Sequence, residues 1–531
     1  MIKTSKIMTA KEVAARIADE ATVVTTAEAS FVVADHLLSA VESRFKAEGH
    51  PRNITFLIPC NGQVGPGTGV DRVGYPGLLK RYIASAFPLQ RGAKVSQMIM
   101  SGEVEAYNFP MGVLYGLLRE VGAGRPGVLT HVGLDTYVDP VHGGGKMTPR
   151  TTEDLVERVT FAGKTLLFYR AFPVDVALIK ATTADTSGNL TMEREPLTLG
   201  SLTLAIAAKA SGGKVYAQVE RIAERHSLPT RSVVVPENLV DGIVLAPDSP
   251  QSDIGHYDPT ITGEFKAHLE PKQVDQGAAR VVAARAAAEL HRGWLINLGV
   301  GIPSDVPTLV WESGLQDLIS ISTEHGAING YPNPLPLFGA HSNADAILDP
   351  PNVFDMYSGG LLDATYLGLA QADAEGNVNV SRFGGLLFGC GGFIDITART
   401  KRIFICGTLA AGGAKVRVGD GRIHIDQEGK VHKLIKRVEH LTLNGRAALA
   451  KGQEVTMITE RGLFRLTQEG WLLTEVAPGI DPERHIAPMI EFPLRKAKKL
   501  QVYAPEVLAG PGPTFGQWLE KRMTRSSSDV A

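Results

Sequence analysis

The chain alternates between short apolar runs and stretches with helical periodicity over most of its length. Runs at 231–236, 317–323 and 401–407 have the length of strands and are rich in Val and Ile, whereas 10–21 and 277–291 carry Ala, apolar and charged residues at helical spacing. Strands that alternate with helices predict open α/β sheets with mainly parallel strands. Ligands of such sheets bind beyond the carboxyl ends of the strands, so we expect the functional site there.

Three patterns in the first part of the chain recur in the same order farther along. An Ala-rich helical run before an apolar strand, the pattern A-D-x-x-G-N-(L/V), and a glycine turn before alternating valines each occur twice. The paired segments are 10–26 and 277–298, 184–190 and 372–378, and 212–220 and 412–420. This ordered recurrence predicts two duplicated open α/β domains with mainly parallel sheets.

The two halves differ in length and are joined by a segment without regular periodicity. The first two pairs of copies are unequally spaced, which predicts an insertion in the first half at about residues 53–146. Residues 249–276 are polar and contain proline, so they predict a linker. We therefore expect an N-terminal half at 1–248 and a C-terminal half at 277–531, because the chain is too long for one hydrophobic core.

Composition and charge exclude several classes of partner. Apolar residues make up 44% and charged residues 21%, which is ordinary globular usage. The formal charge is only -2 with mixed signs throughout, so the chain lacks the basic surface that nucleic-acid binding requires. Apolar runs also fall short of the ~18 residues of a membrane helix, and we expect neither nucleic acid nor a membrane as partner.

The cysteines and the N-terminus indicate the cellular compartment of the protein. Cys60, Cys390 and Cys406 are too few and too scattered for a disulfide framework or a metal site, so we predict no metal and a reducing, cytoplasmic location. The basic start of the chain also fits an organellar transit peptide, although Glu12 and Asp19 count against that alternative.

A carboxylate stands at the end of one predicted strand. Glu324 follows the apolar run 317–323 and precedes a turn of small residues, with no Lys or Arg within eight positions on either side. A carboxylate without an ion-pair partner nearby in sequence can remain reactive. An isolated strand-end Glu is more often solvated or a cap, so the context has to decide.

Two glycine-rich turns supply context in the same half. One contains Gly299 and Gly301 after a predicted strand, and the other is the segment 389–395. Such turns usually mark a positive φ or a close approach of two backbones. The first is not a dinucleotide fingerprint, because Ser304 stands where the third glycine belongs.

The order of the motifs NLGVGIP, TEHGAING and GCGGFIDI in the second half resembles the family I CoA transferases of the single-chain acetate/propionate type. In the first half EAYNFPMG and GLDTYVDP, and near the C-terminus ITERGLFRL and LTEVAPGIDPERHI, also match that family's pattern. The likeness extends from about residue 10 to about residue 493. It implies the CoA transferase fold, which sugar-phosphate isomerases share, and a homodimer or homotetramer.

The resemblance implies a ping-pong CoA-transferase with Glu324 as its nucleophile. The Glu324 carboxylate would attack a short-chain acyl-CoA to give a mixed anhydride, and the CoA thiolate would then form a glutamyl-CoA thioester. An acceptor carboxylic acid would reverse these steps and take the CoA. Acyl-CoA and small carboxylic acids are the expected partners, and no cofactor beyond the substrate coenzyme A is needed.

The family also implies roles for residues around the nucleophile. The tetrahedral oxyanions need preorganised donors, for which the backbone N–H of Gly391 or Gly392 and the side chain of Asn61 are the candidates. A turn-forming role beside Gly62 is the alternative for Asn61. The resemblance places the pantetheine arm of CoA along a loop made of Gly299, Val300, Gly301, Ile302 and Pro303.

Four positions call for separate interpretation. Met111 stands where relatives commonly have Gln, which leaves the acyl preference open, and Asp135 stands where Gly is usual. His325 is expected to point away from Glu324, because adjacent strand residues face opposite sides, so we interpret it as structural. The GGGK segment at 143–146 lacks the spacing of a phosphate-binding loop and predicts a surface loop.

Two other functions compete with the transferase. A CoA thioester hydrolase on the same scaffold would use water as the acceptor, and Glu324 cannot separate the two. A sugar-phosphate isomerase or the ligand-sensing domain of a regulator would share the fold without covalent CoA chemistry. Neither of those accounts for the duplication together with Glu324 and GCGGF, and the sequence leaves the identity of the acyl-CoA open.

Overall fold

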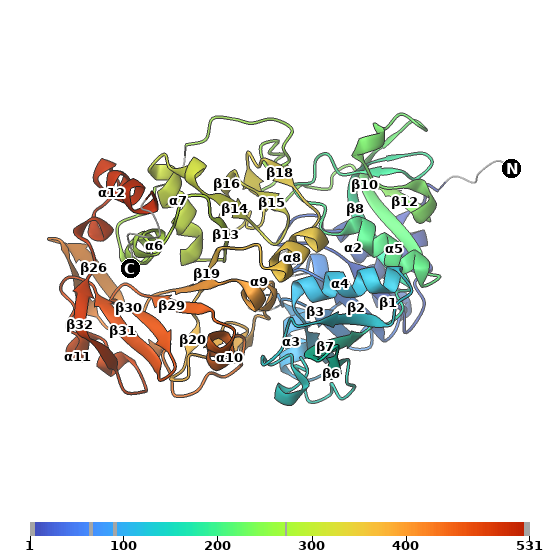
Figure 1. The fold of residues 1–531 in the computed structure, drawn as a ribbon. Coiled ribbons are helices and arrows are strands. Elements are labelled where there is room, and N and C mark those ends of the chain that lie inside the picture. The colour runs from blue at the N-terminus through green and yellow to red at the C-terminus, as the bar shows by residue number, and fades with distance from the viewer. Residues whose placement is uncertain (1–5, 63–66, 89–92, 271–272, 525–531) are drawn as a thin grey trace.

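Two large sheets, one in each half of the chain, form the framework of the molecule (Figure 1). The computed structural model describes residues 6–62, 67–88, 93–270 and 273–524. Between the halves, the described residues of 249–276 contain neither helix nor strand. Both sheets are mainly parallel and carry helices on their faces, so the predicted α/β fold class is confirmed.

The described residues of the N-terminal half form a nine-stranded sheet that is parallel except at β9, which is antiparallel to both β8 and β11. Its order is β11-β9-β8-β1-β2-β3-β4, with β10 and β12 added beside β8. Its central strand β8 is buried at all ten positions, as expected of a parallel strand covered on both faces. The strands are β1 (Thr22–Thr25), β2 (Ile54–Ile58), β3 (Leu79–Ala84), β4 (Glu105–Asn108), β8 (Val176–Asp185), β9 (Leu190–Thr191), β10 (Lys214–Ala223), β11 (Val233–Val235) and β12 (Gly242–Leu245).

Among the described residues, five α-helices and a small extra sheet complete this half. A capping box between Thr9 and Glu12 starts the first helix, and Gly49 in the left-handed region ends the second. The interval predicted to hold the insertion contains β3, β4 and α4, and the extra antiparallel sheet continues beyond it. These elements are α1 (Ala10–Ala15), α2 (Asp35–Glu48), α3 (Lys94–Met100), α4 (Met111–Gly122), α5 (Ser201–Ala210), β5 (Gly127–Thr130), β6 (Val156–Phe161) and β7 (Lys164–Arg170).

The C-terminal sheet has ten strands in the order β18-β15-β14-β13-β19-β24-β29-β30-β31-β32. Its core from β14 to β29 is parallel, and antiparallel strands extend it on both sides. The strands are β13 (Leu295–Leu298), β14 (Ser320–Ser322), β15 (Ala327–Ile328), β18 (Ala346–Ile347), β19 (Ala364–Gly368), β24 (Arg402–Cys406), β29 (Glu454–Ile458), β30 (Gly462–Thr467), β31 (Gly470–Val476) and β32 (Arg495–Val502).

In the described part of this half, seven α-helices and five two-stranded sheets accompany this core. The helices are α6 (Ala278–Ala287), α7 (Asp305–Glu312), α8 (Pro350–Gly359), α9 (Phe393–Arg399), α10 (Gly445–Ala450), α11 (Pro482–His485) and α12 (Pro513–Met523). The short strands are β16 (Tyr331–Pro332), β17 (His341–Ser342), β20 (Gln371–Ala372), β21 (Val378–Asn379), β22 (Arg382–Phe383), β23 (Leu386–Leu387), β25 (Ala410–Ala411), β26 (Lys415–Gly419), β27 (Arg422–Gln427) and β28 (Val431–His432).

The two halves share one strand arrangement. Strands β2-β1-β8-β10-β12 of the first half have the same order and direction as β14-β13-β19-β24-β29 of the second. The A-D-x-x-G-N-(L/V) copies also form the same turn. Asp185 accepts hydrogen bonds from the backbone of Asn189 and from its side-chain amide, and Asp373 does the same with Asn377.

The third recurrence is not part of this duplication. Its first copy is β10, a central parallel strand, but its second copy is β26, which pairs only with β27 in an antiparallel hairpin. The structural counterpart of β10 is β24. A glycine turn before alternating valines is common to many strands, so the pattern was too general to identify a copy.

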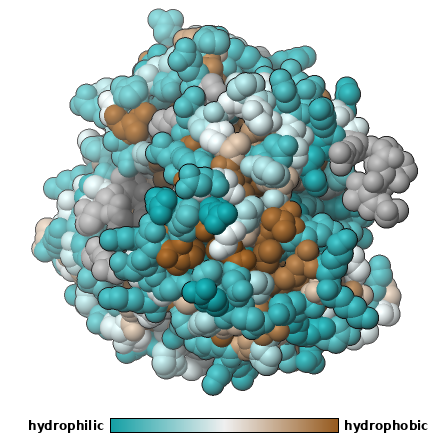
Figure 2. Space-filling view, turned by 90° about the vertical axis from the view of Figure 1, so that its left-hand side faces the viewer, coloured by the Kyte–Doolittle hydropathy of each residue, from teal (hydrophilic) through white to brown (hydrophobic). Residues whose placement is uncertain are grey.

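The face of the molecule shown in Figure 2 is mostly polar. Hydrophilic residues cover most of the face in Figure 2, with hydrophobic residues gathered near its centre. Among the described residues, no helix combines the length and the apolar character needed to cross a bilayer.

Candidate active site

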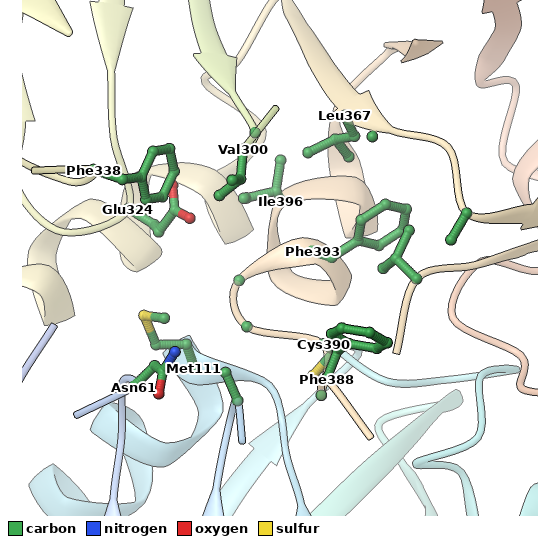
Figure 3. A pocket seen from close by; sticks show the side chains of 18 of the residues that line it. Asn61, Met111, Val300, Glu324, Phe338, Leu367, Phe388, Cys390, Phe393 and Ile396 are labelled. Carbon is green, nitrogen blue, oxygen red and sulfur yellow. The ribbon is translucent and has the colours of Figure 1, made fainter. Parts of the chain in front are cut away.

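Glu324 lies in a cavity of about 400 Å³ between the two halves (Figure 3). It follows β14, where the chain turns back toward β15, and only 8% of the residue is exposed. The described lining includes Glu28, Asn61 and Met111 from the first half. From the second half, lining residues include Val300, His325, Phe338, Leu367, Phe388, Gly392, Phe393 and Ile396.

Asn297 holds the carboxylate of Glu324. Its side-chain amide donates to Glu324 Oε2 at 3.0 Å, and its side-chain oxygen accepts a hydrogen bond from Thr365 at 3.2 Å. The strand register explains this, because Asn297 on β13 is directly opposite Ser322 on β14 and Thr365 on β19. Asn297 opens the NLGVGIP motif, but the family resemblance assigned a role only to residues 299–303 of that motif, and the contact of Asn297 with Glu324 was not predicted.

The GCGGF turn brings its backbone against the nucleophile. The N–H of Gly391 donates to the carbonyl of Ser85 at 2.8 Å, so this donor is already in use. The N–H of Gly392 makes no hydrogen bond within the described residues. A Cβ on Gly392 would lie 3.3 Å from Cγ of Glu324, which shows how closely this part of the main chain approaches the side chain. Of the two predicted alternatives, Gly392 is the one with an available donor.

Hydrogen bonds across the junction fix this turn to the first half. The N–H of Cys390 donates to the side chain of Asn108 at 3.0 Å, and the N–H of Met111 donates to the Gly391 carbonyl at 3.0 Å. The N–H of Gly112, in the first turn of α4, donates to Asp395 on α9 at 3.1 Å. Burial raises the pKa of the Asp395 carboxyl to about 8.

Asn61 and Met111 enter the cavity from the first half. Asn61 follows β2, and Met111 is the first residue of α4. Figure 3 shows both on the side of the cavity opposite Glu324. Met111 is buried, and its sulfur lies 3.6 Å from the sulfur of Cys60. Met111 therefore forms part of the cavity wall across from Glu324.

Only part of the predicted CoA loop reaches the cavity. Gly299 and Val300 line it, with Val300 47% exposed at its rim. Gly301, Ile302 and Pro303 are not among its lining residues, and the chain there enters a short 3-10 helix that leads into α7. Apolar residues from elsewhere, such as Leu367 and Phe393, line the same passage, and the sequence analysis did not find them.

Two other singled-out segments lie outside the cavity lining. Asp135 has a φ of 62°, in the left-handed region that glycine adopts more easily, which explains why glycine suits this position. In the GGGK segment, Gly143 is exposed while Gly144 and Gly145 are buried, and Lys146 pairs with Asp154 at 2.6 Å. That segment is a packed turn at the surface.

His325 faces the cavity beside Glu324. The two residues lie in the turn between β14 and β15, not on a strand, so the expected alternation of faces does not apply and that prediction of its direction was wrong. Nε2 of His325 lies 3.2 Å from Oε2 of Glu28. Burial alone would lower the pKa of His325, but the charges of Glu28 and Glu324 outweigh it and raise that pKa to about 9.

Glu28, Cys60 and His325 are also the residues that come closest to a metal-binding set. Their ligand atoms all lie within 4.8 Å of one another. Burial raises the pKa of the Cys60 thiol, and its sulfur is 2.9 Å from the hydroxyl of Tyr115. The proximity of the three residues is explained by a neutral Cys60 thiol that lies beside the ion pair of His325 and Glu28.

Known proteins are similar to this chain over most of its length. Residues 7–246 match the family model described as coenzyme A transferase. The chain is 39% identical to a caffeate CoA-transferase from Acetobacterium woodii, over 92% of this chain and 94% of that protein. The chain belongs to the coenzyme A transferase family.

Two further relatives agree with this assignment. The transferase is 36% identical to the acetate CoA-transferase YdiF of Escherichia coli K12, over 92% of each chain. The crystal structure of YdiF from E. coli O157:H7 as a thioester complex with CoA has a TM-score of 0.90 and 34% identity, and covers 96% of this chain and 97% of that one. The family resemblance predicted from the motifs is confirmed, and the protein is a CoA-transferase.

Proposed function

We propose that this transferase moves CoA from a short-chain acyl-CoA to a carboxylic acid through a glutamyl-CoA thioester on Glu324. The observation that carries the proposal is the position of the Glu324 carboxylate. It is buried at the end of β14, held by Asn297 and open to the cavity between the halves. The acetate CoA-transferase YdiF and its thioester complex with CoA give independent support.

The proposed reaction has two half-reactions that mirror each other. An oxygen of Glu324 attacks the acyl carbonyl, the carbon–sulfur bond breaks, and a mixed anhydride and CoA thiolate form. The thiolate then attacks the glutamyl carbonyl carbon, the anhydride carbon–oxygen bond breaks, and the acid leaves as a carboxylate. An acceptor carboxylate runs the same steps backward, so the kinetics are ping-pong and no cofactor other than CoA takes part.

Two donors are positioned for the oxyanions of these steps. The N–H of Gly392 is available beside the side chain of Glu324, and Asn61 lines the cavity from the opposite half. Preorganised donors stabilise developing negative charge without reorganisation at the moment of reaction. Because one donor comes from each half, the junction contacts of Gly112 and Asp395 set the distance between them.

The apolar passage suits the pantetheine arm of CoA. Val300 stands at the rim, and Leu367, Phe388 and Phe393 line the passage toward Glu324. A narrow apolar channel keeps water from the anhydride and the thioester, both of which water would hydrolyse. The acids named for the relatives, acetate and caffeate, differ in size, so Met111 and Phe338 beside the nucleophile are the side chains that would select among acids.

Intact-protein mass spectrometry after addition of acetyl-CoA tests the proposal. The wild type should gain one CoA, peptide mapping should place it on Glu324, and added acetate should remove it, whereas Glu324→Ala should gain nothing. Release of CoA into water at the same rate with and without acetate would instead support a thioester hydrolase. No adduct from acetyl-, propionyl- or acetoacetyl-CoA would contradict the covalent mechanism with short-chain donors.

A further inference from the structure

The cavity has to admit an anion, yet its wall is acidic. Glu28 and Glu324 both line it, and its described lining includes neither Lys nor Arg. His325 is the lining residue there that can carry a positive charge at neutral pH. Every acceptor in the proposed reaction is a carboxylate, and like charges at short range in a buried site repel each other strongly.

His325 lies in the cavity wall with both of its ring nitrogens buried. Its side chain is only 2% exposed, and its ring packs edge-on against Phe338 with the ring centres 5.7 Å apart. Neither ring nitrogen has a hydrogen-bond partner of suitable geometry within the described residues. The 3.2 Å contact with Glu28 is thus an ion pair without the alignment of a hydrogen bond. A buried N–H group left unbonded costs about 1–3 kcal/mol, which favours a bound ligand or water at this place.

We propose that His325 binds the carboxylate of the acceptor acid as an imidazolium, and that Glu28 holds it in position for this purpose. The inference rests on the proposed function, because the charge balance changes when Glu324 becomes a thioester. The thioester is neutral, so one of the two carboxylate charges near His325 disappears. The acceptor carboxylate then takes over that charge beside the imidazolium, with one oxygen free to attack the thioester carbonyl.

The other titratable groups around His325 are consistent with this charge state. They are Glu28 after β1, Cys60 after β2, Glu324 in the same turn and His341 on β17. Burial raises the pKa of the Cys60 thiol and keeps it neutral. Burial also lowers the pKa of His341 to about 4, and one of its ring nitrogens bonds to the carbonyl of Asn329 at 2.6 Å, so His341 is neutral as well. Of these five residues, His325 is then the one that carries a positive charge.

If His325 binds the acceptor acid, its replacement should impair the reaction with the acid more than the reaction with uncharged substrates. Acyl-CoA carries no charge on its acyl group, so its attack by Glu324 does not depend on an anion-binding group. A carboxylate acceptor does depend on one, whereas a neutral nucleophile such as hydroxylamine does not. His325 is in this view a positioning residue for the acid.

The test separates the two half-reactions in wild type and His325→Gln. Each protein is loaded with acetyl-CoA, and loss of the CoA adduct from Glu324 is followed with acetate or with hydroxylamine. In His325→Gln the half-saturating acetate concentration should rise about 10- to 100-fold, as expected for loss of a charged hydrogen bond. Discharge by hydroxylamine should change less than about twofold. His341→Gln is the matched control and should resemble wild type with both nucleophiles.

The pH dependence supplies a second readout. Discharge of wild type by acetate should fall as pH rises through the pKa of His325, which is below about 9 in the adduct because the charge of Glu324 is lost, and His325→Gln should lack this fall. Glu28→Gln should move the fall to lower pH, because it removes the counter-charge.

The possible outcomes have distinct meanings. An adduct on His325→Gln that acetate discharges with wild-type concentration dependence would overturn the inference and leave the proposed function standing. Equal loss with acetate and hydroxylamine would also overturn it, because it indicates general damage to the site. Failure of the wild type to form any adduct would refute the proposed function itself.

Discussion

The side-chain amide of Asn297 on β13 donates to the carboxylate of Glu324 across 3.0 Å. Asn297 is fully buried, and it is positioned by its strand neighbours Ser322 and Thr365 rather than by the loop that carries Glu324. The nucleophile sits on a turn, but its direction is set from the rigid centre of the sheet. Sites supported in this way keep their geometry through several bond-making steps.

Replacement of Asn297 by aspartate should disable the nucleophile while it keeps the shape of the side chain. The donor becomes a second carboxylate about 3 Å from Glu324, and repulsion would turn Glu324 away from the acyl carbonyl. We expect the rate of CoA-adduct formation, measured by intact mass, to fall at least about 100-fold. Asn333→Asp is the control, since Asn333 bonds to Ala340 and Ser342 away from the cavity. Equal rates in the two variants would contradict a directing role for Asn297.

Alanine substitutions at Gly391 and Gly392 of the GCGGF turn should affect different properties, thermal stability in the first case and kcat in the second. Gly392→Ala would place a methyl group 3.3 Å from the Glu324 side chain, and it should lower kcat about tenfold or more with little change in thermal stability. Gly391→Ala meets no atom within 4 Å but imposes a φ of 53° on alanine, which costs about 1–2 kcal/mol. That variant should melt earlier and keep its kcat. The reverse pattern would argue against Gly392 as the oxyanion donor.

Asn61 and Asn53 offer a matched pair at opposite ends of β2. Asn61 lines the cavity, whereas Asn53 is exposed. If Asn61 is the second oxyanion donor, Asn61→Ala should lower kcat about 10²- to 10³-fold with little effect on KM. Asn53→Ala should leave both kinetic constants near their wild-type values. Steady-state assays with acetyl-CoA and a second acid check this, and comparable kcat in the two variants would assign Asn61 a turn-forming role only.

Local signals in the sequence singled out Glu324 as a strand-end carboxylate, and the family resemblance gave it the role of nucleophile. An apolar strand that ends in small residues shows where the strand stops, and the absence of nearby cations shows that the carboxylate has no partner in the segment. The same reasoning failed for His325. The strand ends at Ser322, so Glu324 and His325 lie beyond it in a turn, where the alternation of faces does not hold.

The residues that support Glu324 have no comparable local signal. In the sequence, Asn297 is an ordinary polar residue at the end of a strand. Its role becomes apparent only from the register in which β13 pairs with β14. Gly112 and Asp395 lie 283 positions apart, yet a Cβ on Gly112 would lie 2.6 Å from the Asp395 carboxylate. Such contacts depend on how the two halves dock, which periodicity within either half does not determine.

The buried carboxyl of Asp395 makes the stability of the junction depend on pH. Burial raises its pKa from 3.8 to about 8 in the folded state, so the folded protein keeps this proton over a range where the unfolded chain has lost it. Below about pH 4 both states are protonated and the group has no effect. As pH rises from about 4 to 8, only the unfolded state ionises, so the stability of the fold decreases, and above about 8 the decrease stops.

Asp395→Asn should remove this decrease, because asparagine stays neutral and its oxygen can still accept the hydrogen bond from Gly112. We expect the thermal midpoint of the variant, relative to wild type, to be higher at pH 8 than at pH 5, by the equivalent of a few kcal/mol at most. Asp355→Asn is the control, since Asp355 is exposed and pairs with Arg119 at the same junction. A difference between Asp395→Asn and wild type that stays constant from pH 5 to pH 8 would show that Asp395 is ionised in the folded protein.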